Sequence, residues 1–172
     1  KGLIKRRYRV LVMGIPNVGK STLINRLVGK KVVEVGNRPG VTKHLGWIRI
    51  NDKLELLDSP GILWPNLNEE TVALNLASLT AIKEEILPLD DVCVYILNTL
   101  YKYYPNYLNN RYGISSIDNE DITTTLDIIG KKRGCLISGG EVDYDKVYTV
   151  VINDLKEGYI GKVTFDRYGN ND

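Results

Sequence analysis

Apolar positions in the first third of the chain follow the pattern of an α/β domain. Short apolar or alternating runs of strand length are separated by one segment whose apolar residues recur at helical spacing. Asn51-Asp52, between two strand-like runs, is a turn signal and predicts a hairpin. The expected elements, in chain order, are a strand at 7–13, a helix at 20–29 and strands at 47–50 and 54–57. Strand, helix, strand, strand is the opening of an α/β fold.

Beyond residue 65 the apolar spacing becomes helical throughout. Asp90, Asp118 and Asp143 are candidate N-caps, because an aspartate side chain accepts from the free N–H groups of a helix start. The expected helices are 71–85, 91–104, 105–112, 119–132 and 144–157. We therefore expect an α/β part over residues 1–87 and an all-helical C-terminal domain over residues 88–172.

The composition is that of a folded protein without a membrane-spanning segment. The 172 residues are 43% hydrophobic with a net charge of +2, which excludes bulk disorder. The sequence contains no apolar run of about 18 residues, so we expect no transmembrane helix, and no secretory signal pattern is recognisable at Lys1. Cys93 and Cys135 make neither a disulfide framework nor a metal cluster, and a cytoplasmic location is expected.

Charge is unevenly distributed along the chain. Residues 1–31 hold nine lysines and arginines and no acid, whereas the remainder is acidic on balance. Such a basic block is commonly a solvated face, but it is also typical of a surface that meets phosphates or nucleic acid.

The segment Gly14-Ile-Pro-Asn-Val-Gly-Lys-Ser21 matches the phosphate-loop pattern G-x-x-x-x-G-K-S/T in full. It lies between an expected strand and an expected helix, which is the context that the pattern requires. Backbone N–H groups of such a loop surround phosphate oxygens, a lysine reaches the β and γ phosphates, and a serine hydroxyl meets Mg²⁺. The expected nucleotide-binding residues here are Gly14, Asn17, Val18, Gly19, Lys20, Ser21 and Thr22.

Two further segments fit a nucleotide switch. Asp58-Ser-Pro-Gly61 follows a strand, so Asp58 is expected to hold Mg²⁺ and the Gly61 N–H to meet the γ phosphate. Thr42 lies in the loop before the second strand, where a hydroxyl can complete the Mg²⁺ shell. Ser21, Thr42 and Asp58 are therefore the candidate metal ligands.

These motifs together resemble the YlqF/RbgA family of circularly permuted GTPases, which act in assembly of the large ribosomal subunit. The resemblance extends over nearly the whole chain. Its residues are 14–25, 38–42, 54–65, Arg-Tyr-Gly at 111–113 and Lys-Arg-Gly-Cys-Leu-Ile-Ser-Gly-Gly at 132–140. It implies a partial, permuted P-loop GTPase core followed by a helical domain, with GTP, Mg²⁺ and ribosomal RNA as ligands.

The guanine motif N-K-x-D does not occur in the sequence. In the permuted family this motif precedes the phosphate loop, so the resemblance implies that it is encoded upstream of Lys1 and that the chain is the C-terminal portion of a longer protein. Within these residues, guanine and adenine are not distinguished. A P-loop ATPase and a non-catalytic RNA-binding module with a structural phosphate loop remain the alternatives to a GTPase.

The residue that orients the attacking water is not evident. Ile62 stands directly after Gly61, where many GTPases have glutamine, and an aliphatic side chain cannot orient water. His44 is the only histidine and is a candidate, although an exposed loop histidine with no such role is the plainer interpretation. In potassium-activated GTPases with a similar loop, the residue matching Asn17 helps to bind K⁺; the alternative is an asparagine that only braces its own turn.

Partner surfaces are suggested by charge and aromatic residues. Lys131, Lys132 and Arg133 end an expected helix, which suits either the helix dipole or RNA phosphates. Tyrosines near residue 104 are expected in the core and rim of a helix pair rather than on bases. The resemblance favours ribosomal RNA as the partner, and it implies no membrane contact.

Overall fold

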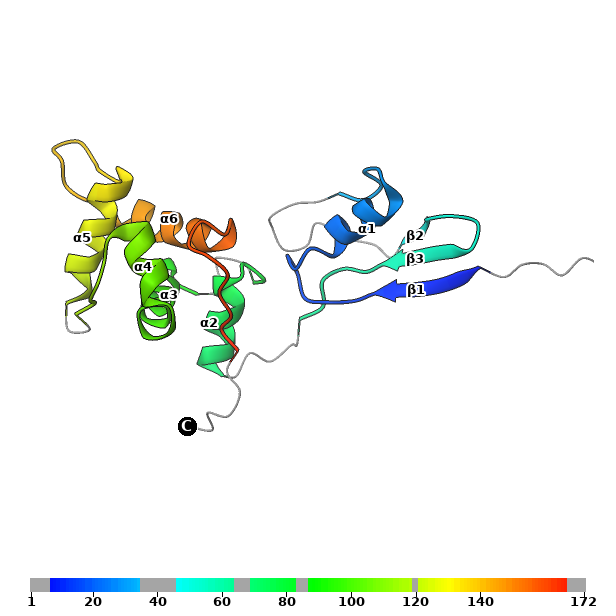
Figure 1. Cartoon of the computed structure of the whole chain (residues 1–172), viewed down its shortest axis with the longest axis horizontal. Coiled ribbons are helices and arrows are strands. Elements are labelled where there is room, and N and C mark those ends of the chain that lie inside the picture. Colours follow the sequence, from blue (N-terminus) through cyan, green and yellow to red (C-terminus); the bar gives the residue numbers. More distant parts are fainter. Residues whose placement is uncertain (1–6, 35–45, 64–68, 83–86, 119–120, 167–172) are drawn as a thin grey trace, which may run out of the picture. The chain divides into compact units, whose positions relative to one another are not determined.

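The computed structural model describes residues 7–34, 46–63, 69–82, 87–118 and 121–166. The chain forms two compact units (Figure 1). The first comprises Lys1–Asn68 and Leu79–Lys83, and the second comprises Glu69–Ser78 and Glu84–Asp172. The chain therefore leaves the first unit, returns to it briefly, and leaves again. A domain division at residues 87 and 88 stays a prediction beside this interleaved arrangement.

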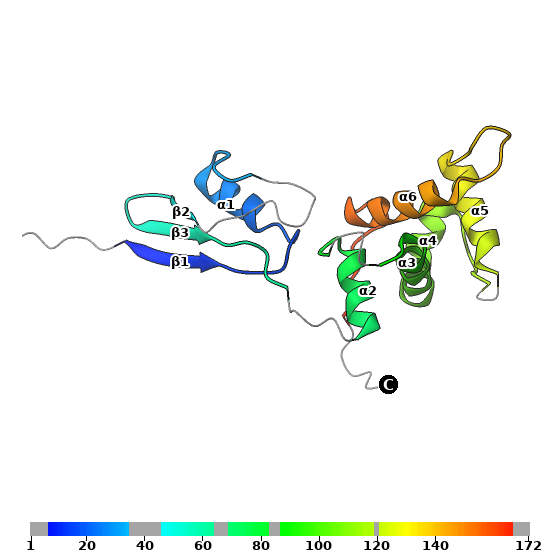
Figure 2. The same ribbon diagram turned by 180° about the vertical axis from the view of Figure 1, so that it is seen from behind.

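In its described residues, the first unit is a three-stranded sheet with a helix against it, and Figures 1 and 2 show this arrangement from opposite sides. The strand order is β1-β3-β2, and α1 packs against β3. The elements are β1 (Tyr8–Val12), α1 (Lys20–Val28), β2 (Gly46–Arg49) and β3 (Leu54–Asp58). Ile24 of the helix and Leu56 of the central strand are both buried. The strands and helix expected from the sequence are thus present.

The central strand pairs in both directions. It runs parallel to β1, with Val12 opposite Asp58, and antiparallel to β2. The expected hairpin at Asn51-Asp52 is confirmed: the Ile50 N–H donates to the Leu54 carbonyl at 3.0 Å, and the Asn51 side-chain oxygen accepts from the Lys53 N–H at 2.8 Å. An asparagine side chain thereby closes a turn that has no glycine.

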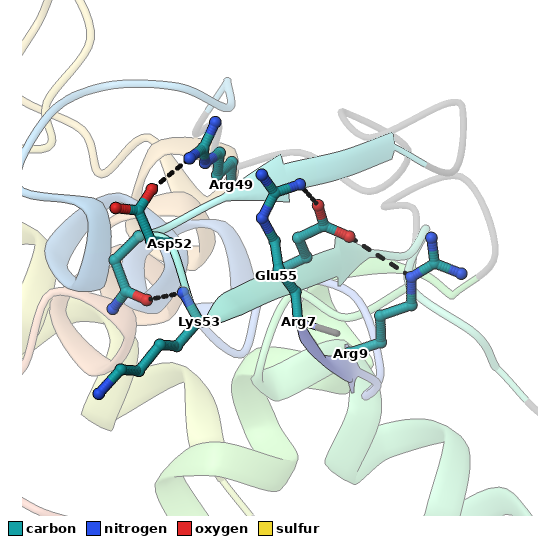
Figure 3. Close-up of polar contacts among 7 residues, drawn as sticks. Arg7, Arg9, Arg49, Asp52, Lys53 and Glu55 are labelled. Atoms are coloured by element: carbon teal, nitrogen blue, oxygen red, sulfur yellow. Dashed lines mark hydrogen bonds and ion pairs between the residues drawn. The ribbon is translucent and has the colours of Figure 1, made fainter. Parts of the chain in front are cut away.

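Part of the basic N-terminal block lies on the sheet and is paired there. Glu55 of β3 accepts from Arg7 at 2.7 Å and from Arg9 at 3.4 Å, while Arg49 bonds Asp52 in the hairpin (Figure 3). Arg7 and Arg9 lower the pKa of the Glu55 carboxyl, chiefly through the Arg7 hydrogen bond. Arg7 and Arg9 therefore have carboxylate partners in the fold itself, which is the plainer of the two interpretations of a basic block.

The second unit is built from helices in the described residues. They are α2 (Glu70–Ser78), α3 (Leu89–Tyr103), α4 (Pro105–Tyr112), α5 (Ile122–Arg133) and α6 (Tyr144–Lys156). Its core is one apolar cluster in which α3 is central, with Cys93, Ile96, Leu97 and Leu100 fully buried. Both cysteines are free thiols in this unit. Within the described part of the chain, no helix is long and apolar enough to cross a membrane.

The predicted cap is right for α6 and wrong for α3 and α5. Asp143 caps α6 by accepting from the Lys146 N–H, as expected. The N-cap of α3 is Pro88, so Asp90 lies in the first turn, where a carboxylate still favours the positive helix end. The cap of α5 is Asp121, which accepts from the Thr123 N–H, and not Asp118.

The helix expected at 71–85 ends at Ser78. The apolar periodicity continues through Leu79 and Ile82, but these residues belong to the first unit, where Ala81 and Ile82 are buried. Thr80 has a φ of +52°, which a continuing helix does not allow. Tertiary packing of residues 81 and 82 thus overrides the local helical pattern.

In the second unit, a buried carboxylate bonds residues of two segments that carry the resemblance to the YlqF/RbgA family, Arg-Tyr-Gly at 111–113 and residues 132–140. Asp154 of α6 is 3% exposed and accepts from the Arg111 guanidinium at 2.6 and 2.9 Å, from the Tyr112 hydroxyl at 3.0 Å and from Arg133 at 3.3 Å. Burial, together with the Asp154 charge, raises the pKa of Tyr112. Arg111 also stacks over the Tyr159 ring. Arg-Tyr-Gly at 111–113 and the basic end of α5 therefore meet at one carboxylate.

We predict that Asp154→Asn lowers the free energy of unfolding by about 3 kcal/mol, because it leaves a partly buried guanidinium without its counter-charge. Asp52→Asn is the matched control. It also removes a carboxylate from an arginine, but its side chain is 90% exposed, so we expect little or no loss. Chemical denaturation of both variants gives the comparison. Equal stabilities would contradict a structural role for Asp154.

Candidate nucleotide-binding site

The segment between β1 and α1 has the geometry of a phosphate loop. Asn17 and Gly19 both have positive φ, at +60° and +89°, and left-handed residues of this kind are typical of turns whose backbone N–H groups bind anions. Gly19 is the N-cap of α1 and has no side chain that could accept from the N–H groups of the first turn. The first turn of α1, which holds Ser21 and Thr22, therefore presents its positive end without a side-chain cap.

Lys20 curls back into this loop. Its ammonium donates to the carbonyls of Gly14 at 3.0 Å and Ile15 at 2.7 Å. Burial lowers the pKa of Lys20, and the negative charge of Asp58 opposes that shift. A positive charge is thus held inside the loop, near an acid of the neighbouring strand.

Asp58 ends β3 at the same edge of the sheet. Because β1 and β3 are parallel with Val12 opposite Asp58, the phosphate loop and the Asp58–Gly61 segment both start from this edge. Hydrogen bonds join them: the Ser59 hydroxyl donates to the Val12 carbonyl at 2.7 Å, and the Ile62 N–H donates to the Gly14 carbonyl at 3.2 Å. Asp58 is 2% exposed, and a carboxylate at this edge has the chemistry that Mg²⁺ prefers.

Gly61 passes directly over the phosphate loop. A Cβ at this position would lie 2.6 Å from the backbone N and Cα of Pro16, which is closer than any real contact. Pro16 is itself buried. The Asp58–Gly61 segment can approach the phosphate loop this closely only with glycine at residue 61.

Two asparagines hold the loop and the helix that follows it. The Asn17 Nδ2 donates to the Thr80 carbonyl at 2.5 Å and lies 3.4 Å from the Thr80 hydroxyl. Asn25 of α1 bonds residues 32 and 33 through both ends of its amide. Asn25 thereby fixes the start of the chain that leads from α1 toward residue 42.

The other predicted site residues are distributed as follows. Val18 is exposed at the loop surface. Thr42 and His44 lie outside the described residues. Lys131, Lys132 and Arg133 form the last turn of α5, in the second unit, where Arg133 bonds Asp154 and all three are exposed. Tyr101, Tyr104 and Tyr107 pack against the core, and Tyr104 stacks on Tyr107. Tyr103, in contrast, is exposed.

Sequence reasoning missed Thr80, Pro16 as the residue beneath Gly61, and Asp154. Thr80 is 63 residues from Asn17 and lies in a stretch whose periodicity indicates helix. No local pattern marks such a partner.

A family model described as "50S ribosome-binding GTPase" matches residues 9–131. The chain belongs to this family of 50S ribosome-binding GTPases. The match begins at β1 and continues through the phosphate loop, the Asp58–Gly61 segment and much of the helical unit. The resemblance to the YlqF/RbgA family is confirmed by the relatives described next.

Curated relatives and solved structures carry matching names. The chain is 50% identical over 166 residues to a ribosome biogenesis GTPase A of Bacillus cereus, which covers 96% of this chain and 56% of the relative. It is 32% identical to the Thermotoga maritima protein of that name, over 94% of this chain and 57% of the relative. A structure of the T. maritima YlqF bound to GDP is similar with a TM-score of 0.61 and 27% identity, covering 94% of this chain and 61% of that one. The chain thus spans somewhat over half the length of these family members.

We predict that Gly61→Ala weakens nucleotide binding and lowers the melting temperature, because the new methyl group must displace the backbone of Pro16. Gly46→Ala is the control. Gly46 also lies in this unit, yet an added Cβ there meets no atom of the described residues within 4 Å. Thermal melting and titration with a fluorescent guanine nucleotide test both variants. Wild-type behaviour of Gly61→Ala would contradict the close approach.

Proposed function

We propose that this chain carries the phosphate-binding part of a GTP-hydrolysing assembly factor for the large ribosomal subunit. The observation that carries the proposal is the joining of a full phosphate loop to Asp58–Gly61 at one sheet edge, in a member of the 50S ribosome-binding GTPase family. Relatives named ribosome biogenesis GTPase A support the assembly role. The helices from about residue 88 onward would then form the C-terminal docking domain, and α2 packs with them in the second unit.

Some groups of the site bind phosphate oxygens, and Lys20 supplies positive charge. Backbone N–H groups of residues 17–19 and the start of α1 bind phosphate oxygens, and Lys20 places its charge beside them. The site's donor set fits Mg²⁺, with the Ser21 hydroxyl and the buried Asp58 as its residues and Thr42 as the third candidate. When bound, the ion neutralises charge that develops on the transferring phosphate.

Ile62 cannot orient the attacking water, so another group must do so. Ile62 follows Gly61 and is 57% exposed, but its side chain has no polar atom that can hold water. Asn17 suggests a further source of charge. An amide oxygen in the phosphate loop suits a monovalent cation such as K⁺, whose charge beside the phosphates stabilises the transition state. His44 remains a candidate for holding the water.

We predict that Lys20→Ala weakens binding of guanine nucleotides by about 10- to 100-fold, since it removes charge-assisted hydrogen bonds to phosphate. Lys53→Ala, an exposed lysine at the opposite end of β3, should bind as wild type does. Titration of the full-length gene product with labelled GTP gives the affinities, and competition by ATP tests the base. Preference for ATP would favour the ATPase alternative. Nucleotide binding unaffected by Lys20→Ala would favour an RNA-binding module with a structural loop.

The end of α5 is the proposed RNA contact. Lys131 and Lys132 are exposed at the helix C-terminus, whereas Arg133 is partly committed to Asp154. The carboxylate thus anchors this turn, while the two lysines remain available to neutralise phosphates of ribosomal RNA.

We predict that replacing both Lys131 and Lys132 by Ala lowers affinity for purified large ribosomal subunits at low salt. The slope of log K against log salt should decrease in magnitude by about 1.5, because two phosphate contacts are lost. Replacing Lys30 and Lys31 by Ala removes the same charge from the first unit and is the matched control. A slope unchanged by the α5 substitutions would overturn this contact.

A further inference from the structure

The chain between α5 and α6 forms a short hairpin, residues 135–143, which we call the α5–α6 hairpin. Figures 1 and 2 show it, in yellow to orange, projecting beyond the end of α5. Its two arms are joined by backbone hydrogen bonds: the Asp143 N–H donates to the Cys135 carbonyl at 2.9 Å, and the Ile137 N–H donates to the Glu141 carbonyl at 2.9 Å. The Gly140 N–H donates to the Ile137 carbonyl at 3.1 Å and closes the turn at the tip. Main-chain bonds therefore define the shape of the hairpin.

The base of the hairpin is held against α5. Cys135 is fully buried, and its N–H donates to the Gly130 carbonyl at 2.8 Å. A Cβ added to Gly130 would lie 2.5 Å from the Val142 side chain, which is closer than any real contact. Glycine weakens a helix, but at residue 130 it lets the returning arm of the hairpin lie close to α5. The hairpin is thus held in one position on the helix.

Aliphatic side chains are exposed on this element although its base is buried. Leu136 is 41% and Ile137 is 48% exposed, and Ile128 of α5 is 43% exposed. Ile128, Lys131 and Lys132 lie on one side of α5, because residues three and four apart are neighbours on a helix. Exposed apolar residues that gather beside charged ones are typical of a contact surface.

The charges around Ile137 indicate which kind of partner fits. Glu141 is exposed and lies across the hairpin from Ile137, and facing residues of an antiparallel pair project to the same side. Lys131 and Lys132, both exposed, come shortly before Ile137 in the chain. A surface that meets phosphates alone would be weakened by a carboxylate at this position, because like charges repel.

The shallow minor groove of an RNA helix presents all the matching groups. Phosphates line its rims, and 2′-hydroxyls and the amino group of guanine lie between them as hydrogen-bond donors. Lysines match the phosphates, a carboxylate matches the donors, and an aliphatic side chain matches the ribose and the base edges. The deep major groove of RNA, in contrast, is too narrow for side chains to read.

We propose that the α5–α6 hairpin enters the shallow minor groove of an RNA helix. Ile137 then lies against ribose and base edges, Glu141 accepts from a 2′-hydroxyl or amino donor, and Lys131 and Lys132 meet phosphates at the rim. This inference rests on the proposed role at the large ribosomal subunit, and it names the RNA feature that the helical unit recognises.

Ile137→Ser tests the apolar contact. We expect the affinity of the full-length gene product for purified large ribosomal subunits to fall about fivefold, because buried apolar area is lost. The slope of log K against log salt should stay as in wild type, since no phosphate contact is removed. Val72→Ser, on α2 of the same unit, removes an aliphatic side chain that is 41% exposed and is the matched control. It should bind as wild type does.

Glu141→Ala tests the sign of the electrostatic effect. We expect affinity for the subunits to fall about fivefold, because a hydrogen-bond acceptor for the groove is lost. If phosphates faced Glu141 instead, the same substitution would remove a repulsion and tighten binding. Glu157→Ala is the control, because Glu157 is an exposed acid at the opposite end of α6. Melting temperatures equal to that of wild type verify that each variant is folded.

A photo-crosslinking amino acid at exposed residue 138, beside Ile137, identifies the class of partner directly. With purified large subunits and a non-hydrolysable GTP analogue, we expect a crosslink that ribonuclease removes. A crosslink to a ribosomal protein alone would overturn RNA as the partner of the hairpin.

The outcomes separate this proposal from the one on which it rests. Wild-type protein that does not bind large subunits would remove the assembly role and the hairpin contact together. Wild-type binding that Ile137→Ser leaves unchanged would overturn the hairpin contact while the assembly role stands. Unchanged or tighter binding of Glu141→Ala would contradict insertion into the minor groove.

Discussion

The parallel register between β1 and β3 is the constraint on which the nucleotide site depends. With Val12 opposite Asp58, the phosphate loop and the segment ending at Gly61 leave the sheet at one edge. The Ser59 and Ile62 hydrogen bonds and the contact of Gly61 with Pro16 all require that alignment. A slip of one residue would turn Asp58 to the other face of the sheet and away from Lys20. Strand pairing therefore decides whether the Asp58 carboxylate lies near the Lys20 ammonium.

The phosphate loop and the Asp58–Gly61 segment were predictable because each is a continuous stretch whose backbone geometry demands particular residues. Gly19 at a positive φ and Gly61 over Pro16 are visible in the sequence as glycines at fixed spacing. The hairpin at Asn51 was predictable for a similar reason, since its side chain closes its own turn. Local chemistry of this kind leaves a local signature.

Contacts between distant segments left no such signature. The end of α2 at Ser78 depends on burial of Ala81 and Ile82 in the first unit, which a helical period cannot reveal. Asp154 resembles any acid on a helix until Arg111 and Arg133, 43 and 21 residues away, are seen to bond it. At Ser78, tertiary packing overrides the helix that the local sequence favours. At Asp154, it adds contacts that the local sequence does not indicate.

The path of the chain gives the contact between Asn17 and Thr80 a consequence beyond the loop itself. The segment that carries Thr80 lies in the sequence between α2 and α3, and those two helices pack on each other in the second unit. The hydrogen bond from Asn17 to the Thr80 carbonyl ties this segment to the phosphate loop within the first unit. If the docked segment stabilises the conformation of the loop at Asn17, the loop in that conformation must stabilise the docked segment equally, because coupling free energies are reciprocal.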